Sequence, residues 1–247
     1  MMQESNSDYD AFAWFFDRHW SVEVQSQILT VIERLLLPLV PRGARLLDLC
    51  CGTGQMAAEL SARGIEVTGL DVSAQMLCHA RAHAPAASFV EADAREFELP
   101  ARYDAVISTF DSLNHLLTLE DLWRVFRQVH RALAPGGWFL FDVNLEEGFL
   151  AHWRDYFSIV EDDNVCVLQG DYDPNQKIGR YDITMFRLHD GTWRRTDAHV
   201  TEKCYSLREI KGALKRAGFK DISTFDAETE MGLADHVGRI FFLVRKG

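Results

Sequence analysis

The chain has 247 residues and a formal net charge of −11. This length suits one large domain, or one domain with a sizeable insertion. The negative charge disfavours a nucleic-acid partner, because that kind of affinity depends on basic side chains that neutralise phosphates. No apolar run is long enough for a membrane span, and the five scattered cysteines lack a C-x-x-C motif, which predicts free thiols and a cytoplasmic protein.

The first predicted helix is strongly aromatic. Residues 8–20 read DYDAFAWFFDRHW. Two interpretations stay open: an amphipathic helix that packs its aromatic rings on the core, or a lid over an active site. A second amphipathic helix is predicted over residues 22–40, where prolines end it.

A nucleotide-binding unit is predicted over residues 45–71. The apolar run 45–49 is long enough for a buried strand and too short for a helix. The loop CCGTG follows at 50–54, then a helix over 55–63 and a strand over 65–70 that ends at Asp71. A strand, a glycine loop, a helix and a strand with a terminal acid form one half of a nucleotide-binding fold.

Two ligands compete for this unit. Residues 52–57 match the dinucleotide pattern G-x-G-x-x-A, with Asp71 about 20 residues further on. Asp48 favours S-adenosylmethionine instead, because a carboxylate before the loop would repel a pyrophosphate and attract a ligand with a sulfonium and an ammonium group. Asp71 suits either ligand, since both carry ribose hydroxyls.

The letters LLDLCCGTG resemble motif I of the class I S-adenosylmethionine-dependent methyltransferases, an apolar run followed by D-x-G-x-G-x-G. Cys50 departs from this motif at the first glycine position, where a small side chain that points away from the ligand would be tolerated. The resemblance implies S-adenosylmethionine as cofactor and implies a set of residues that hold it: Tyr9, Asp48, Cys50, Gly52, Thr53, Gly54, Asp71, Val72, Met76, Asp93, Ala94 and Phe110.

Two features follow the first unit. His79 and His83 have a spacing that can bind a metal, but no third ligand is near in sequence, so we expect an exposed helix surface and no metal site. Asp93 follows a strand predicted over 87–91. It resembles the residue that binds the adenine amino group in the family, and the alternative is an aspartate that forms a turn.

The candidate catalytic residues follow the strand predicted over 103–108. Ligands of open parallel sheets bind outside the carboxyl ends of the strands, so residues 109–115 should face the transferred methyl group. If this segment is helical, Asp111 and His115 share one face, and the carboxylate would raise the basicity of the imidazole. Alternatively, Asp111 caps a helix and His115 is a surface residue.

The string DSLNHL at 111–116 resembles a group of small-molecule methyltransferases. This group includes N,N-dimethyltransferases that act on amino sugars and carry a histidine near the substrate. The resemblance makes His115 the first candidate for a base that faces the acceptor.

The remaining pattern divides the chain into a methyltransferase domain at 1–145 and 206–247 and an antiparallel β insertion at 146–205. Within the insertion, alternating strands are predicted over 158–160, 165–172, 177–188 and 192–205. The resemblance implies that this insertion covers the substrate pocket. A helix over 206–217 and strands over 220–226 and 240–244 complete the domain. The resemblance implies an α/β, Rossmann-like fold: a seven-stranded sheet of order 3-2-1-4-5-7-6, its last strand antiparallel, with helices on both faces.

The expected function is methyl transfer from S-adenosylmethionine to a small-molecule acceptor, with N-methylation favoured over O-methylation. The cofactor supplies the reactivity, and a nearby base keeps an amine neutral for attack. The alternatives are a non-catalytic S-adenosylmethionine-binding protein and an NAD-dependent oxidoreductase. We expect a monomer or homodimer with no nucleic-acid or membrane partner.

Overall fold

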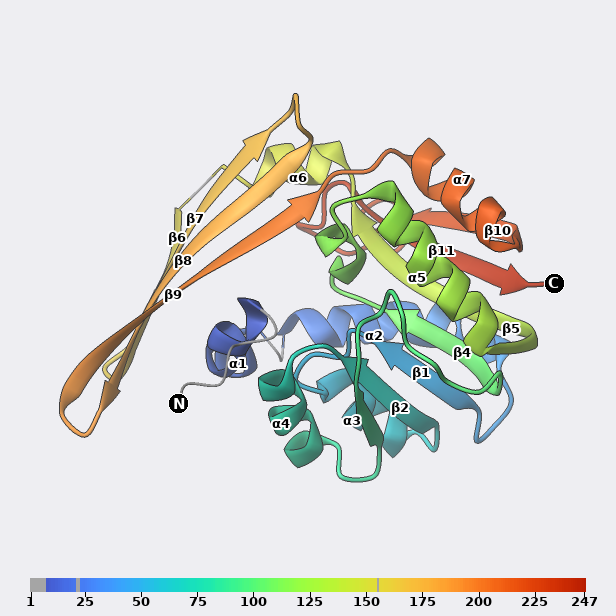
Figure 1. The fold of residues 1–247 in the computed structure, drawn as a ribbon, viewed down its shortest axis with the longest axis horizontal. Helices are drawn as coiled ribbons and strands as arrows, with labels where there is room; N and C mark the ends of the chain where they lie inside the picture. The colour runs from blue at the N-terminus through green and yellow to red at the C-terminus, as the bar shows by residue number, and fades with distance from the viewer. Residues whose placement is uncertain (1–7, 21–22, 155) are drawn as a thin grey trace.

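The computed structural model describes residues 8–20, 23–154 and 156–247 (Figure 1). The first residue of the predicted helix 22–40, and residues 1–7 of the predicted methyltransferase domain, lie outside these ranges. None of the helices in the described ranges is long and apolar enough to cross a membrane.

Within the described residues, seven strands form the main sheet in the order β10-β11-β5-β4-β1-β2-β3. β11 is antiparallel to both of its neighbours, and the pairs that join β3, β2, β1, β4 and β5 are parallel. The predicted order 3-2-1-4-5-7-6 with a last antiparallel strand is therefore confirmed. The strands are β1 (Arg45–Leu49), β2 (Glu66–Asp71), β3 (Ser88–Glu91), β4 (Tyr103–Ser108), β5 (Leu133–Asn144), β10 (Phe219–Asp226) and β11 (Arg239–Lys246).

Helices cover both faces of this sheet (Figure 1). Alternate residues of each central strand point to opposite faces, so Leu46 packs in the core beneath α2 and α3, while Leu47 packs in the core beneath α5 and α7. The helices are α1 (Asp8–His19), α2 (Glu23–Leu35), α3 (Gln55–Ala62), α4 (Ala74–His83), α5 (Leu119–Ala132), α6 (Glu146–His152) and α7 (Leu207–Ala217), with the short 3₁₀ helices η1 (Leu37–Leu39) and η2 (Ser112–His115).

A second, antiparallel sheet follows α6, as predicted for the insertion. Its strands are β6 (Tyr156–Val160), β7 (Asn164–Asp173), β8 (Ile178–His189) and β9 (Thr192–Lys203), paired in chain order. Asp190 and Gly191 join β8 to β9 with positive φ angles of 49° and 73°, which fits the tight turn of a two-residue hairpin. The sheet projects from the main domain and packs against α1 (Figure 1).

Some local details differ from the predictions. The second helix ends at Leu35, and residues 37–39 continue as 3₁₀ helix around Pro38. β5 begins at Leu133 and includes the P-G-G sequence at residues 135–137. Helix α6 at the start of the insertion was not predicted.

Candidate functional site

A cavity of about 1150 Å³ opens where β1, β2, β4 and β5 end. Its walls come from these strand ends, from α1 and from the inner face of the second sheet. Most of the candidate residues line it, although they are scattered in sequence. The lining includes Tyr9, Asp48, Cys50, Gly52, Asp71, Val72, Met76, Asp93, Ala94, Phe110, Asp111 and His115.

Thr53 and Gly54, which were also predicted to hold the cofactor, lie outside the lining of this cavity. The Thr53 hydroxyl donates to Oε1 of Gln55 at 2.6 Å. Gly54 has a φ of 81°, and a Cβ at this position would come within 2.7 Å of Ala80 on α4. These two residues shape the loop and allow α3 and α4 to approach closely.

Asp71 closes the glycine loop from the end of β2. Its carboxylate accepts the backbone N–H of Gly52 at 2.9 Å and that of Ser73 at 2.9 Å. One side chain therefore fixes the loop after β1 and the turn into α4, and it faces the cavity between them.

We expect Asp71→Ala to weaken S-adenosylhomocysteine binding by roughly 100-fold, because hydrogen bonds to a charged group contribute about 1.5–3 kcal/mol each. Calorimetry on the folded variant measures this. Asp104→Ala is the control, since Asp104 caps the N–H of Arg45 at the first residue of β1. If the variant binds with the same affinity as the unmodified chain, Asp71 does not contribute to cofactor binding.

Asp48 provides the clearest test of the predicted ligand. It is 2% exposed, and its Oδ2 atom has no hydrogen-bond partner among the described residues. Burial, followed by the charge of Asp71, raises the pKa of Asp48 to about 8. A buried carboxyl without a partner is costly, so this position fits a ligand that brings an ammonium group and does not fit an anionic pyrophosphate.

Cys50 occupies the first glycine position of the motif in the left-handed region, with a φ of 60°. The residue is among those that line the cavity. Asp93 also lines the cavity, and its carboxylate holds Arg95 through the Nε atom at 2.9 Å and the backbone N–H at 2.8 Å. The turn-forming role of Asp93 is therefore present in the structure.

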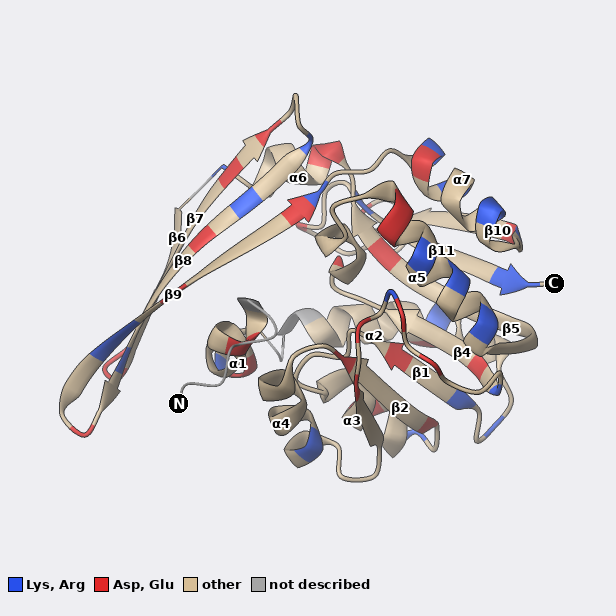
Figure 2. Cartoon of the chain, viewed as in Figure 1, with Lys and Arg blue, Asp and Glu red and all other residues tan. Residues whose placement is uncertain are grey.

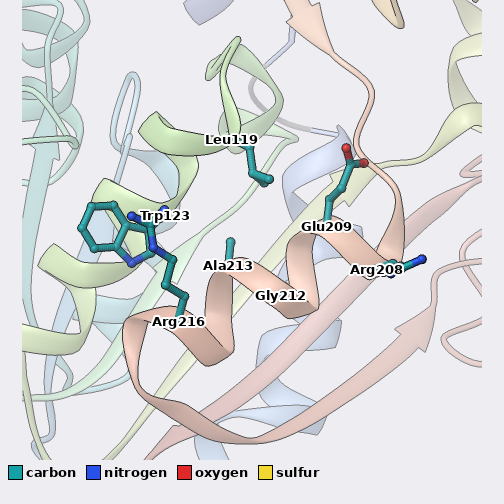
Figure 3. A pocket seen from close by; sticks show the side chains of 7 residues that line it. All are labelled: Leu119, Trp123, Arg208, Glu209, Gly212, Ala213 and Arg216. Carbon is teal, nitrogen blue, oxygen red and sulfur yellow. The ribbon is translucent and has the colours of Figure 1, made fainter.

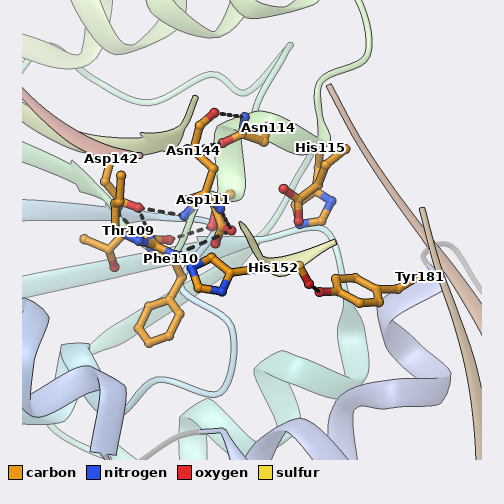
Figure 4. Close-up of polar contacts among 12 residues, drawn as sticks. Thr109, Phe110, Asp111, Asn114, His115, Asp142, Asn144, His152 and Tyr181 are labelled. Carbon is orange, nitrogen blue, oxygen red and sulfur yellow. Dashed lines mark hydrogen bonds and ion pairs between the residues drawn. The ribbon is translucent and has the colours of Figure 1, made fainter. Parts of the chain in front are cut away.

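A buried network forms the opposite end of the site (Figure 4). Asp142, at the end of β5, accepts the backbone N–H groups of Phe110 and Asp111 at 2.9 Å each. It also pairs with Arg239 of β11. Asp111 receives a hydrogen bond from Nδ2 of Asn144 and lies 3.6 Å from Arg239.

This network decides the conformation after β4. Phe110 and Asp111 have positive φ angles of 65° and 47°, and a 3₁₀ helix follows at residues 112–115. The helical face expected for Asp111 and His115 is therefore absent. The bonds to Asp142 hold the two left-handed residues in place, because they satisfy both N–H groups with one buried carboxylate.

His115 lies between the two ends of the cavity. Its Nδ1 atom is 3.3 Å from the carbonyl oxygen of Thr201, and its Nε2 atom is 2.9 Å from the hydroxyl of Tyr9. Because a carbonyl only accepts, Nδ1 carries the proton and Nε2 is the basic nitrogen. Burial lowers the pKa of His115 and outweighs the nearby charge of Asp111, so the expected rise in basicity does not occur.

Glu202 is a site residue that the sequence interpretation missed. It comes from β9, is 5% exposed, and places Oε1 at 3.7 Å from Nε2 of His115. Its Oε2 atom has no hydrogen-bond partner among the described residues, although the residue lines the cavity. Burial raises the pKa of this carboxyl well above its usual range, and the charge of Asp111 adds to the effect.

The aromatic helix α1 packs on the second sheet and also lines the cavity. Phe12 and Phe15 are buried against the inner face of the second sheet. Tyr9, Phe12 and Phe16 line the cavity. Two aspartates attach the helix to α4: Asp10 accepts the Ser73 hydroxyl at 2.5 Å, and Asp17 lies 3.1 Å from Nδ1 of His79.

We expect Asp10→Ala to speed the dissociation of S-adenosylhomocysteine by roughly 5- to 10-fold, because it removes a hydrogen bond worth about 1 kcal/mol that anchors α1. Stopped-flow fluorescence of the nearby tryptophans measures the rate. Asp171→Ala, at an exposed position of β7, is the control. If the two variants release the ligand at the same rate, α1 does not limit its escape.

The second sheet contributes part of the cavity wall. Trp153 and Tyr181 line the cavity, and the Tyr181 hydroxyl donates to the carbonyl of His152 at 2.8 Å. Tyr156 is 74% exposed. A smaller groove of about 290 Å³ lies between α5 and α7, where Arg216 stacks on Trp123 (Figure 3). It shares no residue with the cavity at the strand ends.

Comparisons with known proteins find similarity to methyltransferases. Residues 46–137 match a family model described as a methyltransferase domain. The chain is 28% identical over 243 residues to the putative methyltransferase YqeM of Bacillus subtilis, covering 96% of this chain and 97% of that protein. It is 35% identical over 106 residues to the dTDP-3-amino-3,4,6-trideoxy-alpha-D-glucopyranose N,N-dimethyltransferase of Streptomyces venezuelae, covering 43% of this chain and 45% of that protein.

One solved structure extends the likeness to the whole fold. It is an S-adenosylmethionine-dependent methyltransferase from Clostridium acetobutylicum, which superposes with a TM-score of 0.80 at 21% identity and covers 98% of this chain and 100% of the other. The antiparallel insertion is therefore included in the shared fold.

Proposed function

Because this chain belongs to the class I S-adenosylmethionine-dependent methyltransferases, we propose that it methylates the nitrogen of a small-molecule amine. The assignment to this family disfavours the alternative of an NAD-dependent oxidoreductase. The observation that carries the proposal is the partly buried His115, whose Nε2 atom faces the cavity residues Tyr9 at 2.9 Å and Glu202 at 3.7 Å and whose pKa is lowered by burial. An amine must lose a proton to attack, and such a nitrogen can take it.

The residues divide into two groups by their chemistry. When bound, S-adenosylmethionine supplies a methyl group on a positively charged sulfur. Asp48 and Asp71 suit its ammonium group and its ribose hydroxyls. The aromatic rings of Tyr9, Phe12 and Phe16 line the cavity and suit a cationic methyl group by cation–π contact.

Tyr9 links the residues that suit the cofactor to His115. Its pKa is raised by burial and then by the charges of Glu202, Asp111 and Asp71, so its hydroxyl keeps its proton and donates to Nε2 of His115. A protonated hydroxyl in this position can give its proton to His115 while it takes one from an amine. Transfer of a proton to His115 leaves a histidinium that faces Glu202, whose carboxyl stabilises it.

The similarity to an amino-sugar N,N-dimethyltransferase supports nitrogen as the acceptor atom. The test is transfer of a deuterated methyl group from labelled S-adenosylmethionine to pairs of acceptors that differ only in an amine or a hydroxyl. Mass spectrometry should detect labelled product from the amine of each accepted pair. Label on the hydroxyl partner alone, or on neither member of any pair, would contradict the proposal.

Two further properties are proposed, the cellular location and the oligomeric state. All five cysteines are free thiols in the structure, which supports the prediction of a cytoplasmic protein. Oligomeric state remains a prediction of monomer or homodimer, which light scattering on the purified chain measures.

A further inference from the structure

The acceptor end of the cavity carries an excess of negative charge. Asp111, Asp142 and Glu202 gather around one cation, Arg239, and the charges of Asp111 and Asp142 both raise the pKa of Glu202. Asp142 and Asp111 already use Arg239 as their partner. No described residue gives a hydrogen bond to Oε2 of Glu202, although the side chain is 5% exposed and lines the cavity.

The cavity has little positive charge to offer an anionic ligand. Among the described residues that line it, only Arg95 and Arg239 are Lys or Arg. Arg95 is held by Asp93, and Arg239 is held by the carboxylates behind it. Many Lys and Arg residues lie instead along α5 and α7, on the outside of the main sheet (Figure 2). Phosphate groups need exposed cationic or N–H donors, and here both guanidinium groups are already paired.

We propose that the methyl acceptor is a small aliphatic amine without a phosphate group, and that Glu202, assisted by Asp111, binds its ammonium form. The inference rests on the proposed N-methylation and specifies its substrate class. A carboxyl with a buried, unpartnered oxygen becomes satisfied when an ammonium group donates to it. The same carboxylates repel a nucleoside diphosphate, which distinguishes this chain from a relative named for a dTDP-linked amino sugar.

Glu202 then acts as a specificity residue next to the base. Its Oε1 atom lies 3.7 Å from Nε2 of His115, so an amine bound to Glu202 is also close to the histidine. The charged and titratable groups around Glu202 come from α1, the 3₁₀ helix η2, the β4 loop, β5 and β11: Tyr9, His115, Asp111, Asp142 and Arg239.

The affinity for an ammonium ion should depend on pH with a defined sign. Burial first, and the neighbouring carboxylates second, raise the pKa of Glu202, so the carboxyl holds a proton without a cationic partner. Binding an ammonium group releases that proton. Affinity should therefore increase as the pH rises, over the range in which the amine itself stays charged.

The test uses the full chain saturated with S-adenosylhomocysteine and two probes, 1,4-diaminobutane and thymidine diphosphate, each measured by calorimetry. We expect the diamine to bind and the diphosphate not to bind. Glu202→Gln should weaken diamine binding at least 10-fold and leave S-adenosylhomocysteine binding within about 3-fold, because glutamine keeps the shape and removes the charge. Glu202→Asp should retain part of the diamine affinity.

Glu146→Gln is the matched control, since Glu146 on α6 lies outside the cavity lining. Three results would each overturn the inference. The chain could bind thymidine diphosphate more tightly than the diamine, it could fail to bind the diamine, or Glu202→Gln could leave the diamine affinity unchanged. If amines are methylated and Glu202→Gln has no effect on diamine binding, only this inference fails. If the label moves to hydroxyl acceptors, the proposed N-methylation itself fails.

Discussion

Replacing His115 with alanine is expected to lower kcat for methyl transfer by about 10²- to 10⁴-fold, the usual contribution of a general base. The affinity for S-adenosylhomocysteine should change by less than about 3-fold, because the hydrogen bonds of His115 within the described residues go to Tyr9 and Thr201 and not to the glycine loop. Labelled S-adenosylmethionine with an accepted amine measures kcat, and calorimetry measures the cofactor affinity.

The pH dependence separates a base from a residue that only supports the structure. Burial lowers the pKa of His115 below its ordinary 6.5, and the active form is neutral. In the unmodified chain, kcat should therefore fall only at pH values below 6.5, the ordinary pKa of histidine. This acid limb should vanish in His115→Ala. His189→Ala, at the exposed end of β8, is the control. Equal pH profiles for the His115 variant and the unmodified chain would refute the assignment.

Replacing Arg239 with methionine is expected to lower the free energy of unfolding by about 3–5 kcal/mol. Arg239 is 9% exposed and is the cation paired with Asp142 and Asp111. Its removal leaves buried carboxylates without a counter-charge, which costs more than the lost pair itself. Denaturant unfolding followed by circular dichroism measures the change.

Two further results would identify charge as the cause. The loss should shrink as the pH falls towards about 4, because a buried carboxyl with a raised pKa binds a proton more readily in the folded chain than in the unfolded chain. Arg245→Met, at an exposed position of the same strand, should change stability by less than about 1 kcal/mol. An equal loss of unfolding free energy in both variants would show that the buried ion pair contributes no more to stability than the exposed Arg245.

The sequence was sufficient to predict the sheet because its signals are local. Short apolar runs and the glycine loop each mark one strand or turn, and the strand order followed from the family resemblance. The turn after β4 could not be predicted in the same way. Its left-handed residues, Phe110 and Asp111, depend on Asp142, which lies in another strand and reveals nothing of this role in its own neighbourhood.

Glu202 was missed because a strand alone does not show which face points inward. In β9, Ala198, Val200 and Glu202 alternate on one buried face, where the third position breaks the apolar pattern. An acidic residue in phase with buried apolar neighbours is the signal that could have identified it. Arg239 carried no comparable signal, since a charged residue at the first position of a strand is usually exposed.

The packing of α1 on the second sheet has a consequence for redesign. Phe12 and Phe15 complete the core formed by residues of β7, β8 and β9, although these segments are far apart in the chain. A chimera that receives a new acceptor-binding sheet from a relative must also receive that relative's first helix, or the transplanted sheet will expose its apolar inner face. In this protein α1 and the insertion therefore have to be exchanged together.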